Sequence, residues 1–134
     1  TTTMFDPASV EGQVEAAYLK SWDVYAEAVY NLELDEEALA EVYAEPYLSL
    51  ILSEVEDRIR ERRAALVRVE HDYEIQLNGT DQAVLVDRYR NHQVLIDAEA
   101  KEPIEEDPNE LVIDVVTLVK VGDDWKVARI EELE

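Results

Sequence analysis

The C-terminal end of the chain constrains the fold most strongly. Residues 111–133 read LVIDVVTLVKVGDDWKVARIEEL, a long apolar stretch followed by a Gly-Asp-Asp turn and an alternating stretch that begins at Trp125. Only Asp114, Thr117 and Lys120 interrupt the apolar stretch, 111–121. This pattern predicts a strand that is buried on both faces, in the middle of a sheet covered by helices. The second stretch then closes a C-terminal hairpin.

Three upstream segments have the period of an α-helix. The first spans about 7–31, with Asp6-Pro7 as its N-cap and first helical position. The second begins at the acidic residues 35–37, and Pro46 separates it from a third helix over about 46–64. We expect the inward positions of the three helices to be Val14, Tyr18, Trp22, Tyr25, Val29 and Leu32, then Leu39, Val42 and Tyr43, then Tyr47, Leu50, Ile51, Val55 and Ile59.

The period changes to two after the third helix. Residues 67–77 alternate cleanly and predict a half-buried antiparallel strand, which Asn78-Gly79 joins to a return strand over about 83–96. Neither face of the return strand is cleanly apolar, so we expect a bulge or bend to exchange its faces midway. Residues 97–110 hold seven acids and two prolines without periodicity, which indicates a loop. Its acids lack the spacing of a calcium-binding loop.

Three helices followed by four long strands predict an α+β fold, with the helices gathered on one side of an antiparallel sheet. The length of 134 residues favours one domain over 1–134. Within it we expect residues 1–6 to be a disordered or non-native lead and 97–110 to be an acidic loop.

The charge of the chain excludes several partners. The sequence has 33 acidic and 12 basic residues, a formal net charge of −21, which disfavours nucleic acids and anionic membranes. No apolar run is long enough for a membrane span, and cysteine is absent. Seven arginines cluster between the third helix and the return strand, where they either neutralise neighbouring acids or form an anion-binding patch: Arg58, Arg60, Arg62, Arg63, Arg68, Arg88 and Arg90.

The arrangement resembles a known superfamily. A long first helix with Tyr18 and Trp22, a kinked helical pair and the ending LVKVGDDWKVARIEEL are similar to the nuclear transport factor 2-like (NTF2-like) superfamily, also called cystatin-like or SnoaL-like. The resemblance covers about residues 10–132. It implies a curved sheet wrapped around the first helix, so that the domain forms a cone with a pocket, and homodimers through the sheet face are common in that superfamily. It also extends to acidic bacterial members of unknown role that are exported or lipid-anchored, which favours an extracytoplasmic over a cytoplasmic location.

Enzymes of this superfamily line the pocket with Tyr, Asp and His. The resemblance therefore implies pocket candidates at Tyr18, His71, Tyr89 and Asp114, with Trp22 and Tyr73 as ligand-binding residues. An inward histidine such as His71 is also compatible with a hydrogen-bonded core residue. A carboxylate at Asp114 needs a partner such as Arg88 or Arg90, a role in the pocket, or solvent at a sheet edge.

The sequence leaves two functions open. One is a non-catalytic accessory domain of a bacterial protein that binds a small apolar ligand or a protein partner. The other is a small lyase or isomerase with His71 or Asp114 as base and Tyr18 as hydrogen-bond donor. The acids at 35–37 do not form the isolated base of the isomerases. No phosphate loop, nucleophile elbow or histidine spacing of a metal site is present, so we expect no cofactor and no metal.

Overall fold

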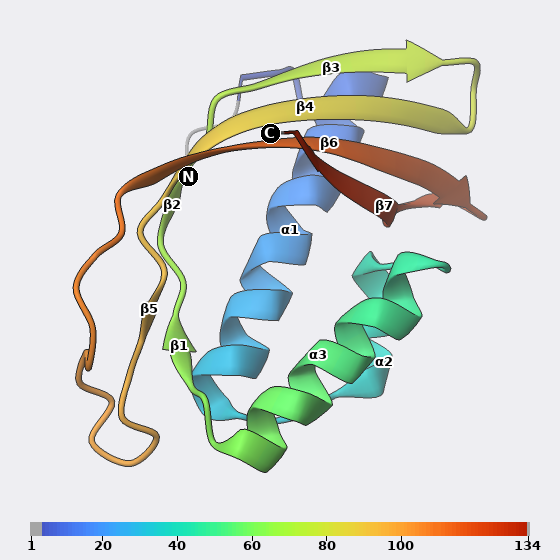
Figure 1. Ribbon diagram of the computed structural model, residues 1–134. Coiled ribbons are helices and arrows are strands. Elements are labelled where there is room, and N and C mark those ends of the chain that lie inside the picture. Colours follow the sequence, from blue (N-terminus) through green and yellow to red (C-terminus); the bar gives the residue numbers. More distant parts are fainter. Residues whose placement is uncertain (1–3, 134) are drawn as a thin grey trace.

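The helical segments fold where the apolar periodicity places them. The computed structural model describes residues 4–133. The three helices are α1 (Val10–Asn31), α2 (Glu36–Val42) and α3 (Tyr47–Glu61). Figure 1 shows them together on one side of a curved sheet, which confirms the predicted α+β architecture. Within residues 4–133, none of the helices is both long enough and apolar enough to cross a membrane.

The helix boundaries follow capping chemistry, with one correction. The hydroxyl of Ser9, and not Asp6, caps α1 by accepting a hydrogen bond of 2.9 Å from the Gly12 N–H. Asp6 lies one turn earlier, where its carbonyl accepts from the Ser9 hydroxyl at 2.6 Å. Serine caps a helix as well as aspartate does, so the Asp6-Pro7 pair forms the turn before α1 instead of its start. The predicted start of α2 is confirmed, because the Asp35 carboxylate accepts from the Ala38 N–H.

The third helix begins directly after Pro46, as predicted. Its buried face differs from the expected one at Leu50, whose side chain is 64% exposed. Ile51 and Val55 are buried, and Leu48 and Leu52 pack against the same core. These four positions define a face on the opposite side of the helix from Leu50, so the predicted inward position of Leu50 is wrong.

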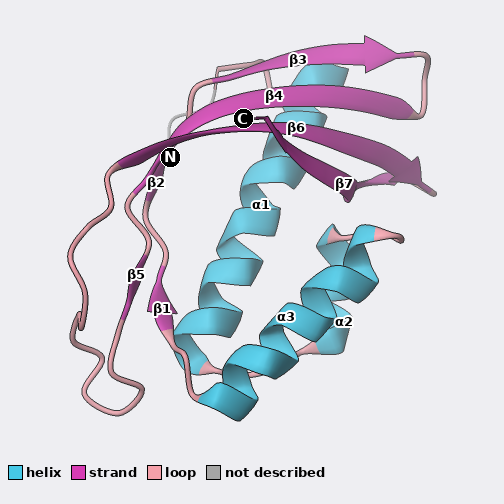
Figure 2. Ribbon diagram, viewed as in Figure 1, coloured by secondary structure: helices cyan, strands magenta, loops and turns pink. Residues whose placement is uncertain are grey.

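From Ala65 to Leu133, the structure describes seven strands in two antiparallel sheets. The main sheet has the order β2-β4-β6-β7, with β3 also paired to β4, and β1 pairs with β5 in a second sheet (Figure 2). The strands are β1 (Ala65–Leu66), β2 (Val69–Glu70), β3 (Tyr73–Asn78), β4 (Gln82–Asn91), β5 (Val94–Leu95), β6 (Glu110–Val121) and β7 (Asp124–Leu133). The two predicted strands 67–77 and 83–96 are thus each divided into shorter ones.

The return strand exchanges its faces, as predicted. Inward positions of β4 have odd numbers, with Leu85 and Asp87 fully buried, whereas Val94 and Ile96 beyond β4 are buried at even numbers. The exchange occurs at residues 92–93, where no strand is assigned. This break lets β5 leave the main sheet and pair with β1, beside the C-terminal end of α1 (Figure 1).

Strand β6 is central in the main sheet, between β4 and β7. The helices cover only one of its faces (Figure 2), so the expectation of cover by helices holds for that face alone. The opposite face of β4 and β6 carries half-buried apolar side chains, so β6 is apolar on both sides. These side chains are Val84, Val86, Ile113, Val115 and Val119. We call these five residues the outer sheet patch.

The two segments predicted to lack regular structure differ in how they are held. Residues 1–3 of the predicted lead lie outside the described residues. The backbone N–H groups of Met4 and Phe5 donate to the buried Glu15 carboxylate on α1, at 2.8 and 3.3 Å. Residues 97–109 contain no helix or strand beyond a single bridge between Ile96 and Pro103. The His92 ring ties this loop to β2, because it lies 2.8 Å from both Asp107 and Glu70.

Candidate functional site

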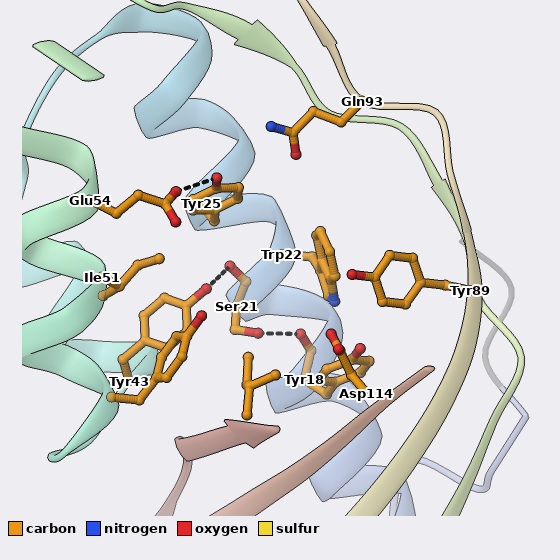
Figure 3. Close-up of a pocket in the computed structure, with 12 residues that line it drawn as sticks. Tyr18, Ser21, Trp22, Tyr25, Tyr43, Ile51, Glu54, Tyr89, Gln93 and Asp114 are labelled. Carbon is orange, nitrogen blue, oxygen red and sulfur yellow. Dashed lines mark hydrogen bonds between the residues drawn. The ribbon is translucent and has the colours of Figure 1, made fainter. Parts of the chain in front are cut away.

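A cavity of about 170 Å³ lies between α1, α3 and the curved sheet. We call it the aromatic cavity. Figure 3 shows side chains from α1, α3, β4 and β6 converging on it. Its lining consists of six aromatic residues, two carboxylates and four others: Tyr18, Trp22, Tyr25, Tyr43, Tyr47, Tyr89, Glu54, Asp114, Ser21, Ile51, Gln93 and Ile130. Within the lining, neither lysine nor arginine is present.

The aromatic walls are formed by rings at steep angles to one another. The Trp22 ring lies 5.3 Å from Tyr89 at 73° and 6.4 Å from Tyr25 at 87°. Tyr43 and Tyr47 form the opposite wall, with centroids 5.6 Å apart. The Tyr43 hydroxyl donates to the Ser21 carbonyl at 3.1 Å, which fixes that wall against α1 (Figure 3). Contacts of this kind hold the rings in place around the cavity.

Asp114 supplies the most unusual charge of the cavity. It is 7% exposed, on the inward face of β6, directly opposite Asp87 on β4 and Glu132 on β7. Desolvation raises the pKa of Asp114 to about 6; the interaction with the Tyr89 hydroxyl opposes that rise, and the charges of Glu132 and Asp87 add to it. A carboxyl group in this setting exchanges its proton near neutral pH.

The predicted arginine partners of Asp114 are wrong. Arg88 and Arg90 are exposed on the outer face of the sheet, whereas Asp114 points inward. The cause is the period of two along β4: Asp87 and Tyr89 share the inward face, and the arginines that alternate with them must face outward. Among residues 4–133, Asp114 forms no salt bridge.

Glu54 lies at the rim of the cavity, because its side chain is 44% exposed. It accepts a hydrogen bond from the Tyr25 hydroxyl, and the Arg58 Nε lies 3.4 Å away on the same helix. Burial is the largest cause that raises the pKa of Tyr25, and the Glu54 charge follows. Glu54 therefore already has partners at the rim, whereas the buried acid at Asp114 has no cation beside it.

A second polar cluster lies under the cavity and is centred on Asp87, which is fully buried. Its carboxylate accepts from the Tyr18 hydroxyl at 2.7 Å and from the Asp72 N–H at 3.0 Å, and the His71 Nδ1 lies 2.6 Å away. Burial and then the Asp87 charge raise the pKa of Tyr18 well above its usual range. Four groups thus share a partly buried hydrogen-bonded network around the fully buried Asp87 carboxylate.

A third cluster involves Tyr73, whose hydroxyl donates to the buried Glu15 carboxylate. Tyr73 is 3% exposed and is not part of the lining of the aromatic cavity. The same carboxylate accepts the N–H groups of the N-terminal lead, so this cluster joins three segments: the lead, α1 and β3.

The predicted site residues therefore divide into two groups. Tyr18, Trp22, Tyr89 and Asp114 line the aromatic cavity; His71 and Tyr73 do not. His71 lies on the other side of Trp22, where it lines a second pocket with Arg68 and Asp23. The sequence-based prediction of the site did not include further members of the lining and the two acids of the buried clusters: Tyr43, Tyr47, Glu54, Gln93, Asp87 and Glu15.

Three of the missed residues had a signal in the sequence. Asp87 alternates with Leu85 and Tyr89 on one face of β4, so an acid between two inward residues was visible. Tyr43 and Tyr47 were expected to point inward from the second and third helical segments. The position of Glu54 at the rim has no comparable signal, since it depends on how α3 crosses the sheet.

The arginine cluster mostly neutralises neighbouring acids. On and after α3, Arg60 pairs with Asp57 at 2.6 Å and Arg63 with Glu61 at 3.0 Å. Arg88 and Arg90 lie apart from these, on the outer face of the sheet. Among residues 4–133, no group of three or more His, Cys, Asp or Glu side chains is arranged to hold a metal ion.

No protein-family model matches the sequence, and no curated protein matches it. Solved structures do match. The intermembrane space region of the chloroplast protein ARC6 has a TM-score of 0.72 at 12% identity, with 98% of each chain covered. An NTF2-like protein of unknown function from Shewanella oneidensis MR-1 has a TM-score of 0.51 at 10% identity, covering 89% of this chain and 98% of that one. The fold is NTF2-like.

The NTF2-like fold also occurs in an enzyme among these matches. Type 2 hexachlorocyclohexane dehydrochlorinase (LinA) has a TM-score of 0.55 at 10% identity, covering 89% of this chain and 88% of that one. At such identities the similarity describes the path of the chain and not the chemistry of the site. The predicted resemblance is therefore confirmed for the NTF2-like fold.

Proposed function

We propose that this chain, acting as one domain, is a non-catalytic binding module that holds a small organic ligand in the aromatic cavity. The supporting observation is the lining itself: six aromatic side chains surround about 170 Å³ instead of filling it. A domain that used these rings only as a core would pack them to a density close to that of an organic crystal. Concave sites with apolar walls and a few polar groups are the usual form of small-molecule sites.

The two tryptophans offer a direct test of this function. Trp22 lines the cavity, whereas Trp125 is buried on β7 outside it. We expect a mixture of small neutral, cationic and anionic compounds to shift the indole N–H signal of Trp22 in NMR spectra and to leave that of Trp125 unchanged. A Trp22→Phe variant assigns the two signals. The proposal fails when no compound shifts the Trp22 signal at millimolar concentration.

A small lyase or isomerase is the alternative, and one observation favours it. Asp114 has a pKa of about 6 beside the Tyr89 hydroxyl, which suits a general base. The predicted roles of His71 and Tyr18 find less support, because both side chains are bonded to Asp87. An enzyme of this kind exchanges the α-hydrogens of small apolar ketones with deuterium from solvent, and Asp114→Asn abolishes the exchange. Equal exchange in the variant and the parent protein excludes Asp114 as the base.

We also propose that the chain forms a homodimer through the outer sheet patch. The support is a row of half-buried apolar side chains that no helix covers, since such patches on soluble proteins mark interaction sites. Val115 is central in this patch, directly opposite Val86 on β4. We expect light scattering to give the mass of a dimer and Val115→Lys to give that of a monomer. A monomeric parent protein overturns the proposal.

For its setting, we propose an accessory domain of a bacterial protein outside the cytoplasm, either exported or lipid-anchored. The support is the structural match to a region from an intermembrane space. Fractionation of the source cells tests this location. Recovery of the full-length protein in the cytoplasmic fraction contradicts it.

A further inference from the structure

The aromatic cavity is lined by two ionisable carboxylates, Asp114 and Glu54, and by neither lysine nor arginine, although Arg58 pairs with Glu54 from outside the lining. We propose that the ligand of the cavity is a small organic cation, an alkylamine or quaternary ammonium compound, held by the aromatic faces and by Asp114. This inference rests on the proposed ligand-binding function and gives its ligand a chemical class.

The aromatic walls suit a cation better than a neutral ligand of equal size. Trp22 meets Tyr89 and Tyr25 nearly at right angles, so the three rings form adjoining sides of a box. Tyr43 and Tyr47 lie across from them. The face of each ring carries partial negative charge, and rings arranged in this way attract quaternary ammonium groups.

Asp114 supplies a full charge inside this box. It is 7% exposed and opposite another buried acid, Asp87, and it forms no salt bridge within the described part of the chain. Burial of a carboxylate without a counter-ion is costly, and a bound cation removes that cost. An anionic ligand, or a substrate that develops an oxyanion, would instead meet a second negative charge without a compensating one.

The net charge of the chain and the size of the cavity agree with this class of ligand. The net charge of −21 attracts cations toward the protein, whereas Glu54 at the rim is already paired with Arg58. The volume of about 170 Å³ is smaller than that of typical pockets for drug-sized ligands, which suits a small amine.

The titration of Asp114 makes the binding depend on pH. Its pKa of about 6 means that a cation meets an ionised partner above this pH and a neutral one below it. We therefore expect the affinity for a cation to fall as the pH decreases through about 6, and the affinity for a neutral ligand to stay constant. The groups that face Asp114 from the surrounding elements are Tyr18 on α1, Tyr47 on α3, Asp87 and Tyr89 on β4, and Glu132 on β7.

Two compounds of the same shape test the inference. Choline carries a quaternary nitrogen, and 3,3-dimethylbutan-1-ol has a carbon atom in its place. In calorimetric titrations we expect choline to bind at least about tenfold more tightly than the alcohol. Asp114→Asn should weaken choline about tenfold and leave the alcohol unchanged. Asp123→Asn, an exposed turn residue outside the cavity, makes the same change of charge and should alter neither affinity.

The outcomes separate the two proposals. Equal affinities for choline and the alcohol, with both shifting the Trp22 signal, overturn the cation and leave ligand binding intact. The same holds when choline does not bind and a neutral or anionic compound shifts that signal. If no compound shifts it, both proposals fail. Should Asp114→Asn not fold, the variant Tyr47→Leu replaces it, because Tyr47 is a half-buried ring of the cavity wall. We expect Tyr47→Leu to weaken the binding of choline more than that of the alcohol.

Discussion

Asp114→Asn is expected to stabilise the protein at neutral pH. The pKa of Asp114 rises from its ordinary value of 3.8 to about 6 in the fold. A rise of this size means that ionised Asp114 costs the folded state about 3 kcal/mol. Asparagine has nearly the same shape without the charge, and a weakened interaction with the Tyr89 hydroxyl returns about 1 kcal/mol. The expected net gain in the free energy of unfolding is about 2 kcal/mol at pH 8.

The gain should depend on pH in a defined direction. Below about pH 4, Asp114 is protonated in both the folded and the unfolded chain, so its charge costs nothing. Between about pH 4 and 6 the unfolded chain releases the proton first, and the cost of the folded state increases to its full value. Asp114→Asn should therefore be about 1 kcal/mol less stable than the parent protein below about pH 4, through the weakened interaction with Tyr89 alone, and about 2 kcal/mol more stable above about pH 7.

Urea unfolding followed by circular dichroism at several pH values measures this difference. Asp123→Asn is the matched control, because it removes the same charge from an exposed turn. We expect the control to change the free energy of unfolding by less than about 0.5 kcal/mol at every pH. A loss of stability in Asp114→Asn that is equal at all pH values would refute the reasoning, since it would mean that the carboxylate is a satisfied structural partner.

Two further predictions concern the other polar clusters. Tyr73→Phe should lower the free energy of unfolding by about 1–3 kcal/mol in urea titrations, because the buried Glu15 loses a donor; an unchanged value would show that solvent replaces the hydroxyl. His92 has a raised pKa, chiefly through Glu70 and then Asp107, so its contribution to stability is complete below about 6.5 and is lost as the pH increases through the raised value. An NMR titration should give His92 a pKa above that of a free histidine, and a pKa at or below the free value contradicts the prediction. His92→Gln should remove this pH dependence of the stability.

Much of the fold could be predicted because each element has a local cause. The periods of 3.6 and two, the cap at Asp35 and the break at Pro46 place the helices and strands close to where they lie. The face exchange in 83–96 followed from its mixed pattern alone. The prediction failed at the start of α1, where Asp6 and Ser9 are both suitable N-cap residues and Ser9 takes that position. It also failed at Leu50, because the orientation of α3 against the sheet determines which of its residues are buried.

The candidate site was less predictable because it depends on register. The apolar surroundings of Asp114 in the sequence correctly mark a buried carboxylate. Its neighbours come from strand pairing, which places Asp87 beside it and excludes Arg88 and Arg90. Side chains alternate between the two faces of β4, so Arg88 and Arg90 must point away from the face that carries Asp87. The predicted pairing of Asp114 with these arginines could therefore have been excluded from the sequence. Tyr43, at the end of α2, and Tyr47, at the start of α3, were both expected to point inward, but no local pattern predicts that the packing of these helices places them across from Trp22.

One row of side chains across the sheet links the protein surface to the cavity. Tyr73, Asp87, Asp114 and Glu132 lie at the same level on β3, β4, β6 and β7. Glu132 belongs to the exposed end of the last strand, yet its charge helps to set the proton affinity of Asp114. A substitution at Glu132 can therefore change the pKa of Asp114 without altering any side chain that lines the cavity. Over evolutionary time, the proton affinity of Asp114 is thus open to adjustment from the solvent-exposed edge of the sheet, where mutations cost little stability.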